Sequence, residues 1–144
     1  MTCGKTLVMA FGTFDLLHPG HLSYLRQAKK LGSRLVVVVA RDSSVKRIKS
    51  RLPVYSERER LGLVSALKFV DRAVLGSIVE KDMLLIVKKM KPDIIALGYD
   101  QNPGNSELRQ KLTEVGIKCK IRRMEAHMPK KHKSSRIRNR LFRG

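Results

Sequence analysis

Short apolar runs alternate with amphipathic stretches along almost the whole chain, and this alternation constrains the fold more than any other feature of the sequence. Runs rich in β-branched residues predict strands at residues 5–11, 34–40, 72–76, 93–98 and 117–124. Helical spacing and end signals predict helices at residues 19–31, 56–67, 82–90 and 105–115, with a last one starting near 134. Strict alternation with short links indicates an α/β chain whose parallel sheet is covered by helices on both faces.

Local signals specify several of these elements. Four consecutive valines at 36–39 suit a strand and fit a helix poorly. Ser56 and Glu59 have the spacing of a capping box, which opens a helix. The basic, serine-rich stretch 41–56 is expected to be a loop with at most a short helical turn. The predicted fold is a Rossmann-like, doubly wound sheet of five parallel strands, which binds ligands beyond the carboxyl ends of its strands.

Length and composition indicate one domain. The chain has 144 residues, of which 42% are hydrophobic and 30% charged, enough for a single globular domain over 1–144. Its apolar runs are far shorter than the roughly 20 residues of a membrane-spanning helix, and no signal peptide is expected. Cys3 and Cys119 are expected to be free thiols in a reducing cytoplasm. The expected location is therefore cytoplasmic, with no membrane partner.

The net charge is unusually positive. Lysine and arginine number 31 against 12 aspartate and glutamate residues, which gives a formal charge of +19. Such a surplus attracts polyanions, either nucleic acid or a phosphorylated small substrate, although it is also compatible with a plain solvated surface. Aromatic residues make up only 5% of the chain and tryptophan is absent, so stacking platforms for single strands are few. Nucleic acid is therefore the less favoured partner.

The stretch GTFDLLHPGH, Gly12 to His21, joins the first predicted strand to the first predicted helix. Pro19 suits a first helical turn, and Gly20 lets an anion approach the backbone donors there. His18 and His21 are three residues apart, which places both rings on one side of the helix start. Two imidazoles at that position can donate hydrogen bonds to phosphate oxygens. The alternative is structural: His18 caps the helix and His21 packs in the core.

The H-x-G-H pattern of this stretch resembles the signature of the nucleotidylyltransferase superfamily, in its cytidylyltransferase-like branch. With LVVVVARDSSVKR at 35–47 and KPDIIALGYDQ at 91–101, nearly the whole chain resembles the archaeal-type FAD synthases. That resemblance implies transfer of the AMP group of ATP to the phosphate of FMN, giving FAD and pyrophosphate.

The same resemblance assigns the site residues. His18 and His21 would be the catalytic pair, holding the phosphates and stabilising the transition state at the α-phosphorus. Thr13 and Phe14 would contact ATP through the turn backbone and the threonine hydroxyl, and Asp100 would lie by the base or ribose. The ATP-binding residues are then expected to be Thr13, Phe14, His18, Pro19, Gly20, His21, Asp100, Ser134, Ser135 and Arg136.

The basic C-terminal segment 130–144 is expected to be part of the site. Ser134, Ser135, Arg136 and Ile137 match the C-terminal element of the family. Independently of the family, two hydroxyls at a helix start followed by a guanidinium form an anion site. The alternative is an ordinary serine-capped tail helix.

Further cations and carboxylates are candidates for the phosphates and their metal. Arg41 and Lys46 are possible phosphate contacts, or else solvated loop charges, and Arg60 is a further candidate. A divalent metal, Mg²⁺, is expected to bridge phosphate oxygens, and its protein ligands are unknown beyond possible roles for Asp15 or Asp100. The alternative for Asp15 is a carboxylate that caps a turn.

The reaction expected is direct in-line attack of the acceptor phosphate on the α-phosphorus, because no covalent nucleophile arrangement is readable in the sequence. The basic stretch 123–133, before the serine pair, matches no family position, and its two histidines, His127 and His132, are expected to be loop histidines. Two alternatives stay open: a cytidylyltransferase acting on a small phosphorylated alcohol such as glycerol 3-phosphate, and a nucleic-acid-binding module. A homodimer is possible on the resemblance alone.

Overall fold

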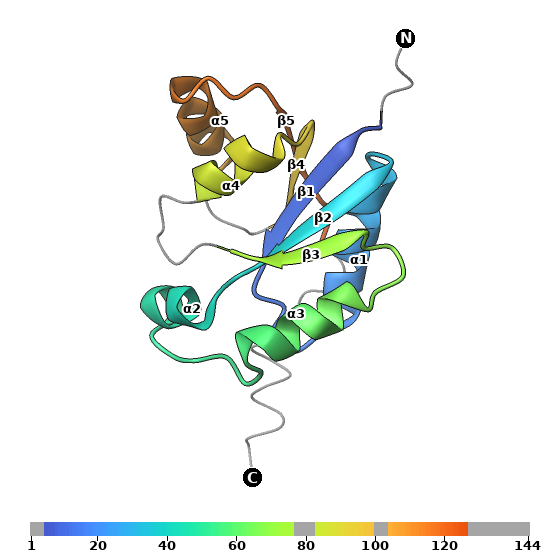
Figure 1. Cartoon of the computed structure of the whole chain (residues 1–144), viewed down its shortest axis with the longest axis vertical. Helices are drawn as coiled ribbons and strands as arrows, with labels where there is room; N and C mark the ends of the chain where they lie inside the picture. The colour runs from blue at the N-terminus through green and yellow to red at the C-terminus, as the bar shows by residue number, and fades with distance from the viewer. Residues whose placement is uncertain (1–4, 77–82, 100–103, 127–144) are drawn as a thin grey trace.

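The computed structural model describes residues 5–76, 83–99 and 104–126 and contains one five-stranded sheet (Figure 1). The strands are β1 Leu7–Gly12, β2 Arg34–Val39, β3 Arg72–Leu75, β4 Ile94–Leu97 and β5 Lys120–Arg123. The helices are α1 Pro19–Lys30, α2 Asp42–Lys49, α3 Glu57–Ser65, α4 Met83–Met90 and α5 Asn105–Glu114. The strand order is β3-β2-β1-β4-β5, and every pair is parallel. The predicted α/β, doubly wound, Rossmann-like fold is therefore confirmed.

The sheet buries both faces because successive side chains of a strand point to opposite sides. On β1, Val8 belongs to a core cluster with Leu25 of α1, whereas its neighbour Met9 belongs to a second cluster with Val87 of α4 and Leu108 of α5. Figure 1 shows α1 and α3 on one side of the sheet and α4 and α5 on the other. From β1 the chain winds outward to β2 and β3, then returns to β4 on the other side of β1. The strand order thus reverses at the carboxyl end of β1.

The stretch 41–56 was expected to be a loop with at most a short helical turn, and that expectation is wrong for residues 42–49, which form the eight-residue helix α2. Its one buried side chain, Val45, gives too little apolar periodicity to be recognised in a sequence. Instead, Asp42 in the first turn and three basic residues in the last turn suit the helix dipole. The helix ends at Ser50, whose φ of 61° is left-handed. Figure 1 shows α2 beyond the carboxyl ends of β1 and β2.

The other expected elements within the described residues are present with small shifts of their ends. The capping box of Ser56 and Glu59 is formed in both directions, which confirms that signal. The fifth strand is shorter than expected, 120–123 rather than 117–124, because its pairing with β4 begins at Lys120 opposite Ile94. The expected start of the helix at residue 82 and the helix near 134 lie outside the described residues. No helix in the described part of the chain is long and apolar enough to span a membrane.

Candidate active site

The connection from β1 to α1, residues 13–18, lies at the point where the strand order reverses. We call it the signature turn. Phe14 within it has a φ of 54°, a left-handed conformation that is uncommon for a bulky residue. Its ring is 2% exposed and packs over Gly12, where an added Cβ would lie 2.6 Å from Phe14 Cζ. The absence of a side chain at Gly12 is what lets the turn fold back on the strand.

Phe14 also links the turn to the helix that follows. Its ring stacks on Tyr24, with centroids 6.3 Å apart, and meets the edge of His21 at 5.4 Å. The Tyr24 hydroxyl donates to the carbonyl of Ala96 on β4, at 2.8 Å, and accepts from the N–H of Phe11, at 3.2 Å. Burial raises the pKa of Tyr24, so this hydroxyl keeps its proton. Helix α1 is thereby fixed against both strands at the reversal point.

His18 caps helix α1 through one ring nitrogen. The N–H of Gly20 donates to His18 Nδ1 at 3.1 Å, and the His18 backbone is extended as in other helix caps. A neutral imidazole that accepts at Nδ1 carries its proton on Nε2, which makes Nε2 a hydrogen-bond donor. The structural reading of His18 as a cap is therefore correct, and it fixes the tautomer that a phosphate-binding histidine needs.

His21 lies directly against His18. The two ring centroids are 3.8 Å apart and the ring planes differ by 26°, so both imidazoles do lie on one side of the helix start. Burial, the neighbouring His18 and the charge of Lys49 lower the pKa of His21 from 6.5 to about 3, against a smaller opposite effect of the Leu16 backbone. Its Nδ1 is buried and has no hydrogen-bond partner among the described residues. His21 is thus uncharged at neutral pH.

Lys49 is a site residue that sequence reasoning missed. It is exposed near the end of α2, yet its charge contributes to the low pKa of His21, so α2 brings a cation to the histidine pair. Arg41, Val45 and Lys49 are spaced four residues apart, and Val45 is buried, so this stripe faces the rest of the molecule. That spacing is the signal that would have found Lys49. Lys46, the residue selected from the sequence, is exposed on α2.

Arg60 has a structural position. Its side chain is fully buried, and Nη1 donates to the carbonyls of Thr13, at 2.8 Å, and Ala40, at 2.7 Å. Nη2 forms an ion pair with Asp42 at 2.7 Å, and Nε donates to the carbonyl of Tyr55. Arg60 therefore joins the signature turn, the end of β2 and the start of α2, and it is no surface contact for phosphate.

Arg41 stabilises the same region. Its Nε donates to the carbonyl of Gly76 at 2.7 Å, and its Nη1 pairs with Glu57 at 3.1 Å. Glu57 in turn accepts from the N–H of Asp42. Two nitrogens of Arg41 thus hold the start of α2 to the end of β3 and to the start of α3. These bonds limit how far the Arg41 side chain can turn towards a phosphate.

Asp15 caps a loop, as its structural alternative predicted. Its carboxylate is 5% exposed and accepts from the N–H groups of Val54 and Tyr55, each at 2.9 Å. In the described part of the chain no three His, Cys, Asp or Glu side chains cluster closely enough to hold a metal ion. These residues do not build a protein cage for a divalent metal.

The remaining expected ATP contacts divide into two groups. In the described residues, Phe14 offers only its backbone because its ring is in the core, Pro19 is exposed, and the N–H of Gly20 is bound to His18. The carbonyl of Thr13 is bound to Arg60. The second group lies outside the described residues and consists of Asp100, Ser134, Ser135 and Arg136. The two loop histidines, His127 and His132, also lie outside the described residues.

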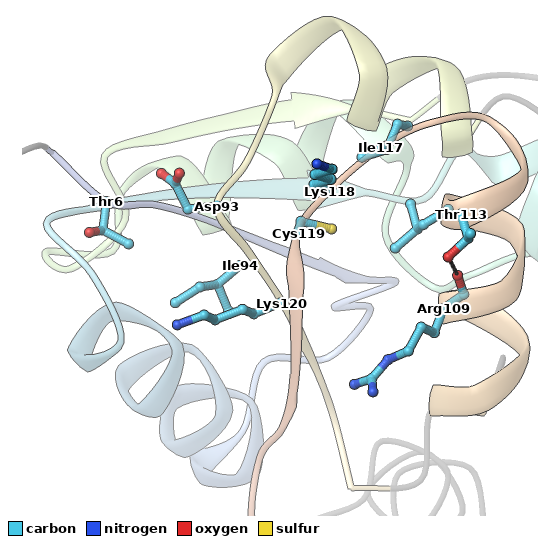
Figure 2. Close-up of a pocket in the computed structure, with 10 residues that line it drawn as sticks. Thr6, Asp93, Ile94, Arg109, Thr113, Ile117, Lys118, Cys119 and Lys120 are labelled. Carbon is cyan, nitrogen blue, oxygen red and sulfur yellow. Dashed lines mark hydrogen bonds between the residues drawn. The ribbon is translucent and has the colours of Figure 1, made fainter.

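A separate groove lies at the opposite edge of the sheet (Figure 2). It is lined by residues at the amino ends of β4 and β5, including Asp93 and Lys120, and by Arg109 and Thr113 of α5. Parallel sheets of this kind bind their ligands at the carboxyl ends of the strands, where the histidine pair lies. The groove is therefore not the candidate active site.

Comparison with known proteins identifies close relatives. Residues 9–140 match the family model described as cytidylyltransferase-like. A curated protein of Thermoplasma volcanium named FAD synthase is 48% identical over 135 residues, covering 94% of this chain and 93% of that protein. One of the same name from Methanothermobacter thermautotrophicus is 52% identical over 123 residues, covering 83% of this chain and 80% of the other.

Solved structures agree on the fold. A Thermoplasma volcanium structure described as a lipopolysaccharide core biosynthesis protein has 51% identity and a TM-score of 0.80, covering 86% of this chain and 99% of that chain. A pantoate-β-alanine ligase from Francisella tularensis, with 16% identity and a TM-score of 0.65, covers 94% of this chain and 65% of that one. The second likeness concerns the fold alone.

Proposed function

This chain belongs to the cytidylyltransferase-like family, and from that membership we propose that it works as an FAD synthase. It is a nucleotidyltransferase: a phosphate oxygen of FMN attacks the α-phosphorus of ATP, the bond from that phosphorus to the bridging oxygen breaks, and pyrophosphate leaves. The observation that carries the reaction type is the stacked histidine pair at the start of α1, where the strand order reverses. The relatives named FAD synthase, about half identical to this chain, support ATP and FMN as the substrates.

His18 and His21 are the proposed catalytic residues. Nε2 of His18 carries a proton and donates it in a hydrogen bond to a phosphate oxygen. Negative charge on the α-phosphoryl group and the leaving pyrophosphate is then met by fixed dipoles, the principal requirement of phosphoryl-type transfer. Because His21 is uncharged, the pair does this without mutual repulsion between two imidazolium rings.

The surrounding residues supply position and charge. The dipole of α1 favours an anion beside Pro19 and Gly20, and Lys49 adds a cation at the pair. We propose backbone contacts to ATP from Thr13 and Phe14. A phosphate contact of Gly20 requires its N–H to leave His18, since that donor is engaged in this structure.

The family resemblance assigns Asp100 to the base or ribose, and Ser134, Ser135 and Arg136 to a second anion site in the C-terminal segment. Lys46, which is exposed on α2, and Arg41, whose bonds to Gly76 and Glu57 limit its reach, are proposed for the outer phosphates on their charge and position alone. Mg²⁺ is proposed to enter with the triphosphate, since Asp15 is engaged by two backbone N–H groups.

The setting of the reaction follows from its substrates. Both substrates and the product pyrophosphate are anions, and a net charge of +19 raises their encounter rate in a salt-dependent way. Neither nucleic acid nor a membrane takes part in the proposed reaction. A cytoplasmic homodimer is the proposed form of the enzyme.

The test is a substrate panel. The protein is incubated with Mg²⁺ and either ATP or CTP, together with FMN, glycerol 3-phosphate or phosphocholine, and pyrophosphate release is followed. Product from ATP with FMN, identified as FAD by chromatography, is the expected result. Product from CTP with glycerol 3-phosphate instead would show that the protein is a cytidylyltransferase acting on a small phosphorylated alcohol.

A further inference from the structure

Exposed apolar side chains are concentrated in one short segment. Eight large hydrophobic residues are exposed in the described ranges, and four of them fall within residues 48–55. These four are Ile48 at 67% exposure, Leu52 at 58%, Val54 at 45% and Tyr55 at 38%. The others are spread over α3, α4 and the segments after β4 and α5. We call the four residues the apolar shelf.

The apolar shelf is fixed beside the signature turn. Asp15 of that turn accepts from the N–H groups of both Val54 and Tyr55, and Arg60 donates to the carbonyl of Tyr55 while also holding Thr13. The backbone of Tyr55 is thus bound on both sides by residues tied to the turn that carries the histidines. Its side chain, in contrast, is directed outward enough to be more than a third exposed. A firmly held backbone with an exposed aromatic ring is suited to contact with a ligand.

Positively charged side chains lie among the residues of the apolar shelf. Lys46, Arg47, Lys49 and Arg51 are exposed between or next to the shelf residues, and Lys49 acts on His21. A ligand that fits this segment therefore combines a flat apolar part with an anionic group directed at the histidine pair. Of the two substrates, the acceptor FMN has that form: a broad isoalloxazine ring joined by a ribityl chain to a terminal phosphate. Glycerol 3-phosphate has the phosphate but no ring.

We propose that the apolar shelf binds the isoalloxazine ring of FMN, with Tyr55 as the residue that determines specificity for a flavin acceptor. The inference rests on the proposed function and extends it to the ring of the second substrate. Tyr55 presents its face to the ring, Leu52 and Val54 contact the ring beside it, and the FMN phosphate then reaches the α-phosphorus held at the histidine pair. Aromatic stacking together with lost apolar contact is worth about a tenfold change in affinity or more.

The test measures steady-state FAD synthesis with FMN varied at saturating ATP, and with ATP varied at saturating FMN. Tyr55→Ala is expected to raise the KM for FMN about tenfold and to leave the KM for ATP within twofold. Tyr55→Phe is expected to restore the wild-type value, because the stacking face remains. Leu52→Gln, at an exposed position, should raise the KM for FMN by a smaller factor. Leu85→Ala on α4, also an exposed apolar residue, is the matched control and should change neither KM.

The outcomes separate this inference from the proposed function. If the wild-type protein makes FAD but Tyr55→Ala and Leu52→Gln leave the KM for FMN unchanged, the shelf does not bind the acceptor and only this inference falls. If the variants instead convert a dimer to a monomer in sedimentation without changing that KM, the shelf is an interface between copies, which also overturns it. If the wild-type protein makes no FAD from ATP and FMN, both the inference and the proposed function fall together.

Discussion

The imidazole rings of His18 and His21 stack with their centroids 3.8 Å apart and their planes within 26° of each other. Burial of the His21 ring, followed by repulsion from His18 and the charge of Lys49, lowers the pKa of His21 and keeps it neutral. The stacking therefore links a structural arrangement to a protonation state.

Stability should depend on pH through His21. Its pKa is about 3 in the folded chain and close to 6.5 when unfolded. Above pH 6.5 both states are neutral at this residue. As the pH falls from 6.5 towards 3, His21 is protonated in the unfolded chain but stays neutral in the folded chain. The free energy of unfolding therefore decreases across that pH range. Between pH 7 and pH 5 the loss should reach up to about 2 kcal/mol.

Urea unfolding at pH 7 and at pH 5 measures this loss, with His21→Gln as the comparison. The variant lacks the titrating group, so its stability should change less between the two pH values. An equal change in both proteins would mean that His21 accepts a proton in the folded state, contrary to its low pKa.

Removal of the Lys49 charge should raise the pKa of His21, because that charge is one of the causes of its lowering. In Lys49→Met, the His21 ring signals followed by NMR should titrate at higher pH, and FAD synthesis should slow because a cation beside the phosphates is lost. Lys118→Met makes the same charge change at the opposite edge of the sheet. If the two variants behave alike, the effect comes from net charge and Lys49 has no local role.

Arg60 should be irreplaceable even by lysine. Its guanidinium group donates hydrogen bonds to three backbone carbonyls and to Asp42 at once. The ammonium group of a lysine cannot reproduce that planar arrangement of donors. Arg60→Met leaves three carbonyls and a carboxylate without their donor and is expected to cost about 3–5 kcal/mol of unfolding free energy. Arg60→Lys should recover only part of this. Full stability of the lysine variant in urea would show that the separate guanidinium contacts contribute little.

Gly12→Ala should disturb the signature turn. The new Cβ would lie 2.6 Å from Phe14 Cζ, and the ring cannot retreat because it is buried. We expect a loss of about 1–3 kcal/mol in stability and a larger loss of turnover, since small displacements of catalytic groups cost about a hundredfold in rate. Gly62→Ala in α3 is the control, because its Cβ meets nothing within 4 Å. There the same change should be neutral or stabilising, and a similar effect at both positions would contradict the packing argument.

The fold and the histidine pair were predictable because their signals are local. Apolar alternation marks the strands, and H-x-G-H places two rings on one side of a helix start. What the sequence did not reveal depends on contacts between distant segments. Arg60 donates to Thr13 across 47 positions of sequence, and the charge of Lys49 acts on the pKa of His21 from a helix in a stretch that was expected to be mostly loop. Charged residues that are structurally bound, such as Arg60, look the same in a sequence as those that bind phosphate.

His18 shows why a structural and a functional reading need not exclude each other. The sequence presented the helix cap and the phosphate donor as alternatives. In the structure the cap uses Nδ1, and the donor proposed for phosphate is Nε2. A single ring can therefore serve both roles, and a variant that retains only one of them can separate the two.

The decisive measurement is the turnover of His18→Ser with ATP and FMN. Serine is a preferred helix cap, so this variant should keep the stability of α1, which thermal unfolding verifies. Its short hydroxyl cannot take the place of Nε2, and turnover should fall about a hundredfold or more, as it does when one transition-state donor is removed. A stable His18→Ser protein that makes FAD at the wild-type rate would contradict the catalytic role of the histidine pair.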